Sequence, residues 1–263
     1  MAKQSALRFT SRTDAKKLLR IAGLPAVSAL FSAAPDRVQR LFFDQRMKPH
    51  VAVLCGQLAR LHKPYRLVET EELSRIAGSV MHGGIVALAR PRPLPAVDAQ
   101  EAAQWAGDGR LLLMLDGVGN PHNLGAIART AAFFGVPRIV ISDHPAQAGP
   151  SDASYRIAEG GLEYVELYRS AGFAPMLRQL RRTYRVVAAA AEKGQPIAAL
   201  QPRQGPFALV LGNEEHGLPH ATLAACDETV TIAGSGLVQS LNVAATAAIL
   251  LHAFAGRAFM PSL

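Results

Sequence analysis

The sequence predicts an α/β protein with two domains: a small mixed α/β domain, followed by a larger domain built on a parallel sheet with helices on both faces. A length of 263 residues is large for a single compact core. Prolines at positions 91, 93 and 95 favour extended chain, which is typical of a linker. After them, strand-length apolar runs alternate with helical segments through short loops. We expect domains at 1–90 and 108–263, joined by a proline-rich linker at 91–107.

In the first domain, residues 14–22 are predicted to form a helix. Residues 40–43 and 51–54 are short strand candidates because they are rich in apolar residues. Residues 83–90 read GGIVALAR, which indicates a strand that follows a glycine turn.

In the second domain, residues 111–115 form a continuous apolar run, the pattern of a strand buried on both faces. Small residues at helical spacing predict a helix over 124–134. The other predicted strands are 138–142, 164–168, 185–190, 207–211 and 228–232, and the other predicted helices are 153–160, 171–184 and 241–256. The order of these elements indicates a parallel sheet, whose ligands bind at the loops that follow the carboxyl ends of the strands.

The positive charge is concentrated at the beginning of the chain. Residues 1–90 hold 15 Lys and Arg against 6 Asp and Glu, whereas residues 91–263 hold 13 against 14. A solvated basic face would explain this, but so one-sided a distribution favours a polyanionic partner, above all nucleic acid. The candidate contacts are Arg8, Arg12, Lys16, Lys17 and Arg20, followed by Arg37, Arg40, Arg46 and Lys48. Charge alone does not separate RNA from DNA.

Several classes of protein are disfavoured. No stretch approaches the roughly 18 apolar residues of a membrane span, and the N-terminus lacks the apolar block of a signal peptide, so we expect a cytoplasmic protein without membrane contact. The two cysteines, Cys55 and Cys226, lie far apart and outside any CxxC spacing. We therefore expect two small buried thiols with no disulfide and no metal site.

The loop that follows residues 111–115 reads DGVGNPHNLGAIARTA, residues 116–131. His122 stands where a dinucleotide-binding fingerprint needs its third glycine, which argues against a nicotinamide-dependent dehydrogenase. Asn123 lies at a helix start, where it serves either as a simple N-cap or as a site residue. Arg129, among Ala and Ile on the same helix, needs an anionic or polar partner.

Two later loops have the same position relative to a strand. The loop LGNEEHGL, residues 211–218, combines Gly212 and Gly217, which allow close approach of a ligand, with Glu214. A solvent-facing acidic turn is the alternative. The last loop, IAGSGLVQSLN at 232–242, leads through Ser240 and Asn242 into the last helix, which Ser240 could merely cap.

Together and in this order, the three loops closely resemble the three motifs of the SpoU, or TrmH-like, branch of the SPOUT RNA methyltransferases. The matching residues are Asn123, Gly125, Ile127, Arg129, Thr130 and Ala131, then Gly212, Glu214 and Gly217, then Ser240, Leu241 and Asn242. The resemblance covers about residues 110–257. More loosely, the segment His82–Ala87 resembles the His-x-Gly segment that ends the family's small substrate-binding domain, which is related in shape to the ribosomal proteins L30e and L7Ae. Ala233 and Gly234 depart from the family pattern, where Ile-Pro is usual.

The resemblance implies a deep trefoil knot in the C-terminal domain, a homodimer through that domain, and S-adenosylmethionine held in the knot loops. It implies methyl transfer to a ribose 2′-hydroxyl of structured RNA, either rRNA or tRNA. Arg129 would be the central catalytic residue, with Asn123, Glu214, Ser240 and Asn242 fixing the ribose, the cofactor and the loops. The cofactor contacts it implies are Leu211, Gly212, Gly217, Ile232 and Leu241.

Two other functions remain open from the sequence. A noncatalytic RNA-binding or ribosome-assembly protein would keep the fold without methyl transfer, although the complete set of polar motif residues argues against it. Methylation of a base on the same fold is disfavoured, because the Asn-to-Arg and Ser-Leu-Asn motifs belong to the 2′-O branch.

Overall fold

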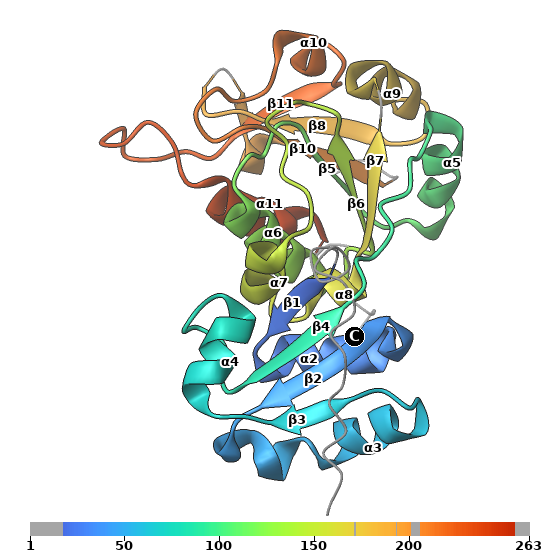
Figure 1. Cartoon of the computed structure of the whole chain (residues 1–263). Coiled ribbons are helices and arrows are strands. Elements are labelled where there is room, and N and C mark those ends of the chain that lie inside the picture. Colours follow the sequence, from blue (N-terminus) through green and yellow to red (C-terminus); the bar gives the residue numbers. More distant parts are fainter. Residues whose placement is uncertain (1–17, 171, 193, 201–205, 256–263) are drawn as a thin grey trace, which may run out of the picture. The chain divides into compact units, whose positions relative to one another are not determined.

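The computed structural model describes residues 18–170, 172–192, 194–200 and 206–255. The chain divides between Pro93 and Leu94 into two compact units (Figure 1), named unit 1 and unit 2 below. The basic candidates Arg8, Arg12, Lys16 and Lys17 lie outside the described residues.

Unit 1 contains a four-stranded sheet in the order β1-β4-β2-β3. Strand β4 is antiparallel to β1 and β2, whereas β2 and β3 are parallel. The strands are β1 (Leu19–Ala22), β2 (Val38–Phe43), β3 (Tyr65–Leu67) and β4 (Ile85–Ala89), and the helices are α2 (Leu24–Ala33), α3 (Ala52–Arg60) and α4 (Thr70–Ala77), with short 3-10 helices η1 (Pro35–Arg37) and η2 (Gln45–His50). The predicted strands at 40–43 and 83–90 are confirmed as β2 and β4.

The helix predicted at 14–22 is wrong over its described part, because Leu19–Ala22 is strand β1. The sequence has helical periodicity, but pairing with β4 buries Ile21 completely, and tertiary packing overrides a weak local preference. The strand then ends at Gly23, whose φ of 91° is unfavourable for other residues.

The strand predicted at 51–54 is also wrong, since this segment begins helix α3. Val51 and Val53 favour a strand, yet the buried residues Val51, Leu54 and Leu58 recur at helical spacing. Val53, in contrast, is 73% exposed.

Unit 2 contains a seven-stranded sheet in the order β7-β6-β5-β10-β8-β11-β9, in which all neighbouring strands are parallel. The strands are β5 (Leu112–Leu115), β6 (Arg138–Ser142), β7 (Glu166–Ser170), β8 (Arg185–Ala189), β9 (Gln195–Pro196), β10 (Phe207–Leu211) and β11 (Glu228–Thr231). The predicted α/β fold with a parallel sheet is confirmed. Strand β10 enters the sheet between β5 and β8, although both precede it in the chain.

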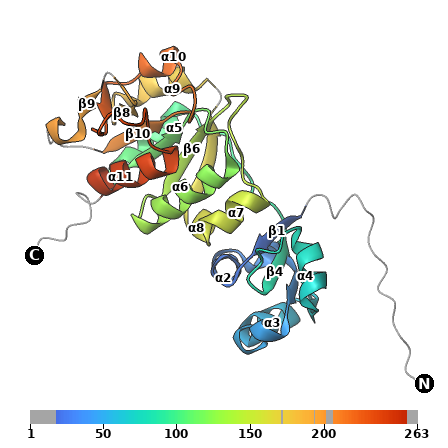
Figure 2. The same ribbon diagram turned by 90° about the vertical axis from the view of Figure 1, so that its left-hand side faces the viewer.

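Helices cover both faces of this sheet (Figure 2). One layer holds α6 (Pro121–Phe133), α7 (Asp152–Ala158), α8 (Gly161–Tyr164) and α11 (Val243–Ala255). The other holds α5 (Ala99–Gln104), α9 (Phe173–Leu180) and α10 (His220–Leu223), and η3 (Trp105–Asp108) and η4 (Ile197–Ala199) are short 3-10 helices. All four residues of β5 are buried because both faces are covered, which explains its uninterrupted apolar sequence.

The segment predicted as a linker, 91–107, contains a folded part. Ala96 pairs with Arg169 beside β7, and Asp98 caps α5 by accepting a hydrogen bond from the Glu101 amide. Ala99 and Ala102 are buried in the core shared with α9. The alternating prolines leave only the beginning of this segment extended, because the alanine-rich stretch after Asp98 favours a helix.

Candidate functional site

The three loops predicted to carry the chemistry follow β5, β10 and β11, so they meet at the carboxyl edge of the sheet. This edge of a parallel sheet is where ligands bind in α/β folds. The loop after β5 begins at Asp116, the one after β10 at Gly212, and the one after β11 at Ile232.

Asn123 lies inside the first turn of α6 and is only 8% exposed. The N-cap of this helix is Asn120, whose Oδ1 accepts a hydrogen bond from the His122 amide at 2.8 Å. The N-cap alternative for Asn123 is therefore wrong, because Pro121 already occupies the first helical position. The Asn123 side chain is free to make a tertiary contact.

That side chain joins all three loops. Asn123 Nδ2 donates to Glu214 Oε1 at 2.5 Å, and Asn242 Nδ2 donates to Asn123 Oδ1 at 3.1 Å. Asn242 Oδ1 also accepts from the Ala244 amide at 2.8 Å, which anchors the start of α11. One buried amide thus fixes the second loop on one side and the third loop on the other.

The second loop is shaped by Asn213, a residue that sequence reasoning missed. Its Oδ1 accepts from the Glu215 and His216 amides at 2.9 and 3.0 Å, and its Nδ2 donates to the Gly117 carbonyl at 2.8 Å. An Asn side chain that accepts a hydrogen bond from the backbone N–H two residues later is a known turn signal. The sequence Gly-Asn-Glu-Glu could therefore have indicated the role of Asn213. Asn213 sets the loop conformation and ties it to the loop after β5.

Gly212 is required by close packing, because a Cβ atom there would overlap the backbone of Gly217 and the side chain of Leu218. Gly217 has a φ of 67°, and no atom lies within 4 Å of the position its Cβ would take. The backbone at Gly217 therefore borders open space.

The remaining predicted contacts lie around this edge in different environments. Leu211 is buried at the end of β10, Ile232 is half-buried after β11, and Leu241 is 46% exposed. Ser240 lies in the exposed stretch before α11.

Arg129 is not part of the network around Asn123. It lies six residues further along α6, about 9 Å along the helix axis. Its Nη2 pairs with Glu159 Oε2 at 2.9 Å, and the two side chains are 57% and 49% exposed. Glu159 ends α7 with a φ of 44°, an uncommon conformation for a residue with a side chain. The expected anionic partner of Arg129 is thus Glu159, which nothing in the sequence singled out.

A second missed contact holds the end of β5 to α10. The Asp116 carboxylate is 4% exposed and accepts from Thr222 Oγ1 at 2.6 Å. Next to it, the half-buried Cys226 thiol donates to the Thr222 carbonyl at 3.2 Å. Burial, with the nearby Asp227 charge, raises the pKa of Cys226 to about 12, so this thiol stays protonated at neutral pH.

The described part of the chain holds no group of three or more His, Cys, Asp or Glu side chains arranged to bind a metal ion. Among the same residues, no helix is both long enough and apolar enough to cross a membrane.

Comparisons with known proteins agree with this geometry. The model of the SpoU rRNA methylase family matches residues 110–252, and the model described as RNA 2′-O ribose methyltransferase substrate binding matches residues 20–95. The first range covers the parallel sheet of unit 2 with its three loops, and the second covers the mixed sheet of unit 1.

Curated relatives agree with this assignment, and a solved structure has the same fold. The 23S rRNA (guanosine-2′-O-)-methyltransferase RlmB of Acinetobacter baylyi is 33% identical over 88% of this chain and 94% of its own length. The uncharacterized tRNA/rRNA methyltransferase YfiF of Escherichia coli O157:H7 is 34% identical over 88% of this chain, which spans 66% of that relative. The AdoMet-bound rRNA methyltransferase of Sinorhizobium meliloti superposes with a TM-score of 0.74 at 23% identity, covering 94% of this chain and 90% of that one. The chain belongs to the SpoU rRNA methylase family.

Proposed function

We propose that this protein transfers a methyl group from S-adenosylmethionine to a ribose 2′-hydroxyl of rRNA or tRNA. The observation that carries the proposal is the Asn123 amide, which binds Glu214 and Asn242 and so joins three family motifs at one edge of the sheet. The RlmB relatives are named as 23S rRNA 2′-O-methyltransferases, which favours rRNA.

The residues at this edge fit the cofactor. Open space beside the Gly217 backbone leaves room for a ligand at the second loop, and the half-buried Glu214 carboxylate offers an anion to a cationic one. Residues that would hold S-adenosylmethionine are Leu211, Gly212, Gly217, Ile232 and Leu241. When bound, the cofactor supplies an electrophilic methyl group on a sulfonium ion.

Arg129 would act on the RNA rather than on the cofactor loops. A guanidinium does not lose its proton in proteins, so Arg129 is a poor general base. It can instead bind the phosphate beside the target ribose and stabilise the alkoxide that develops on the 2′-oxygen. Because the Arg129–Glu159 pair is exposed, an RNA phosphate can replace Glu159 as the partner of the guanidinium.

The test is to incubate the protein with methyl-labelled S-adenosylmethionine and unmodified rRNA and tRNA transcripts, then to identify the labelled nucleoside. A 2′-O-methyl nucleoside is expected. A labelled base would overturn the reaction, and absence of both label and cofactor binding would favour a noncatalytic RNA-binding protein.

The variant Arg129→Lys tests the proposed role, because lysine keeps the charge but lacks the planar fork. Turnover should fall by about 10²-fold or more while cofactor affinity stays unchanged. Arg178→Lys, on the exposed face of α9, is the matched control. Normal turnover in Arg129→Lys would remove this residue from the mechanism.

We also propose that unit 2 forms a homodimer, which is supported by large apolar side chains left exposed on it. Phe133 is 81% exposed, Tyr164 62% and Ile249 40%. Sedimentation equilibrium should give twice the chain mass, and Phe133→Glu should shift the protein toward monomer. A monomeric wild type would refute the proposal.

We also propose that unit 2 contains a trefoil knot, as the family resemblance implies. We propose a cytoplasmic location, where rRNA and tRNA substrates are found.

A further inference from the structure

Unit 1 exposes two consecutive large apolar side chains on the loop 78–84, which joins α4 to β4. Val80 is 80% exposed and Met81 is 71% exposed. A single exposed apolar residue is ordinary, whereas two adjacent ones in the middle of a short loop expose a larger apolar surface to solvent. We call these two residues the apolar tip.

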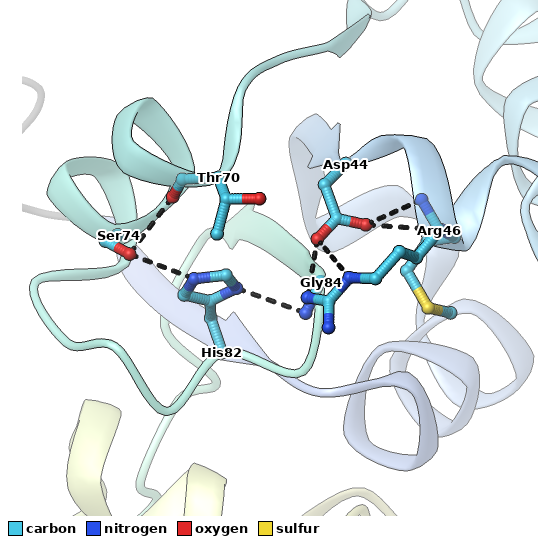
Figure 3. A network of polar contacts seen from close by, with 7 residues as sticks. Asp44, Arg46, Thr70, Ser74, His82 and Gly84 are labelled. Atoms are coloured by element: carbon cyan, nitrogen blue, oxygen red, sulfur yellow. Dashed lines mark hydrogen bonds and ion pairs between the residues drawn. The ribbon is translucent and has the colours of Figure 1, made fainter.

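The base of the loop is locked by His82, which is 3% exposed. Its Nδ1 accepts the Gly84 N–H at 3.1 Å, so the ring proton is on Nε2 and is donated to Ser74 Oγ at 3.0 Å. Ser74 Oγ in turn donates to the Thr70 carbonyl at 3.0 Å. Figure 3 shows His82 between the Ser74 side of α4 and Gly84. The histidine thus ties both ends of the loop together.

Three glycines in left-handed conformations complete the turn, with φ values of 67° at Gly78, 57° at Gly83 and 81° at Gly84. Because the loop is fixed on folding, little conformational entropy remains to be lost when the apolar tip binds a partner.

Arginines lie at both ends of the loop. At one end, the guanidinium of Arg20 borders Gly78 closely enough to overlap a Cβ atom placed there. At the other end, a Cβ at Gly84 would lie 2.9 Å from the Asp44 carboxylate, which binds Arg46 Nε and Nη2 at 3.0 and 2.7 Å. The Arg46 side chain nevertheless stays 70% exposed.

The charge of unit 1 favours a nucleic acid as the occupant of this surface. Its described residues hold 11 Lys and Arg but only 5 Asp and Glu. Two of these acids already pair with arginines, Asp44 with Arg46 and Glu72 with Arg66. An apolar tip on a loop with an arginine beside each end matches an unpaired nucleotide, whose base has flat apolar faces and is flanked by two phosphates along the chain.

We propose that the apolar tip packs against an unstacked base of the RNA substrate while Arg20 and Arg46 bind the phosphates on either side. This rests on the proposed function, since it assumes an RNA substrate. The Met81 thioether is well suited to contact a base, because it is polarizable and flexible. Unit 1 thereby selects RNA that contains single-stranded or bulged nucleotides.

The test compares Val80→Ser/Met81→Ser with wild type for binding to unmodified 23S rRNA and tRNA transcripts, measured by fluorescence anisotropy. Loss of base packing should weaken RNA affinity about tenfold, with an unchanged salt slope and unchanged cofactor affinity. Arg20→Gln and Arg46→Gln should each weaken affinity and reduce the salt slope by about one.

Val53→Ser and Arg60→Gln are matched controls, because both positions are exposed on α3 of the same unit. Wild-type RNA affinity in the Val80/Met81 variant would overturn the proposal. So would normal affinity for free RNA combined with lost methylation of ribosomal particles, which would assign the apolar tip to a protein partner. If wild type itself neither binds nor methylates RNA, the proposed function has failed instead.

Discussion

The hydrogen bond between Asn123 and Glu214 can be tested by reversing its polarity. Asn123→Asp replaces the donating amide with a carboxylate of nearly the same shape, so that two carboxylates meet where the present contact is 2.5 Å. At about 3 Å, with an effective dielectric constant between about 80 and 20, their repulsion is about 1.4 to 5.5 kcal/mol. A charge-assisted hydrogen bond of about 1.5–3 kcal/mol is lost as well. We expect the free energy of unfolding to fall by about 3 kcal/mol or more.

The compensating change is Glu214→Gln. In the double variant, the amide introduced at position 214 can donate to the carboxylate introduced at position 123, and Asn242 Nδ2 can still donate to that same carboxylate. The double variant should therefore be within about 1.5 kcal/mol of wild type, which gives a coupling energy of about 1.5 kcal/mol or more.

Unfolding by urea can be followed for unit 2 alone, because Trp105 is the single tryptophan of the chain and belongs to that unit. It packs against Tyr168 with ring centroids 4.8 Å apart and lies beneath the Arg138 guanidinium, so its fluorescence should report loss of this packing. If the double variant is no more stable than Asn123→Asp, Asn123 does not donate to Glu214 and the geometry assigned to the site is wrong.

Further predictions concern single positions. Gly125→Ala should lower the free energy of unfolding of unit 2 by about 1–3 kcal/mol, because a Cβ there overlaps the Ser154 carbonyl. Helix propensity alone would stabilise this variant, so increased stability would refute the close packing of Gly125 against Ser154. Burial and the Asp108 charge raise the pKa of Tyr184 to about 12, above the ordinary value of about 10 in the unfolded chain. The stability that the buried phenol contributes is therefore lost as pH rises from about 10 through 12. A phenolate absorbance at 295 nm near pH 10 in native wild type that is absent in Tyr184→Phe would contradict the raised pKa. Cys226 should remain unmodified by a thiol-disulfide reagent at pH 8 until the protein unfolds, and fast native labelling would show that its thiol is accessible. His82→Ala should accelerate hydrogen exchange at the Gly84 amide, which loses its acceptor, and unchanged exchange would mean that this bond does not hold the loop.

Strands buried on both faces were predictable from the sequence with accurate bounds. Residues 138–142 and 207–211 coincide with β6 and β10, because a continuous apolar run flanked by polar or turn residues has few other stable arrangements. Residues 14–22 and 51–54 failed for the opposite reason. Their apolar residues fit both the spacing of a strand and that of a helix. Only pairing with β4, or packing of α3, decides between the two.

Within the candidate site, the sequence indicated which loops matter but not how their side chains pair. The contacts of Asn123 with residues 91 and 119 positions away depend on the order of strands in the sheet, which no local pattern encodes. The pairing of Arg129 with Glu159 likewise depends on how α7 packs on α6. The cofactor and RNA contacts predicted for individual residues stay predictions.

The late position of β10 in the chain has a consequence for how the protein is made. Until residues 207–211 leave the ribosome, β5 and β8 lack the strand that separates them, and both present unpaired edges lined by apolar side chains. Such edges are sites of aggregation in partly folded chains, and contacts of long sequence separation form slowly. The nascent protein is therefore most vulnerable between the synthesis of β8 and that of β10, and this interval is where a chaperone would have the largest effect on yield.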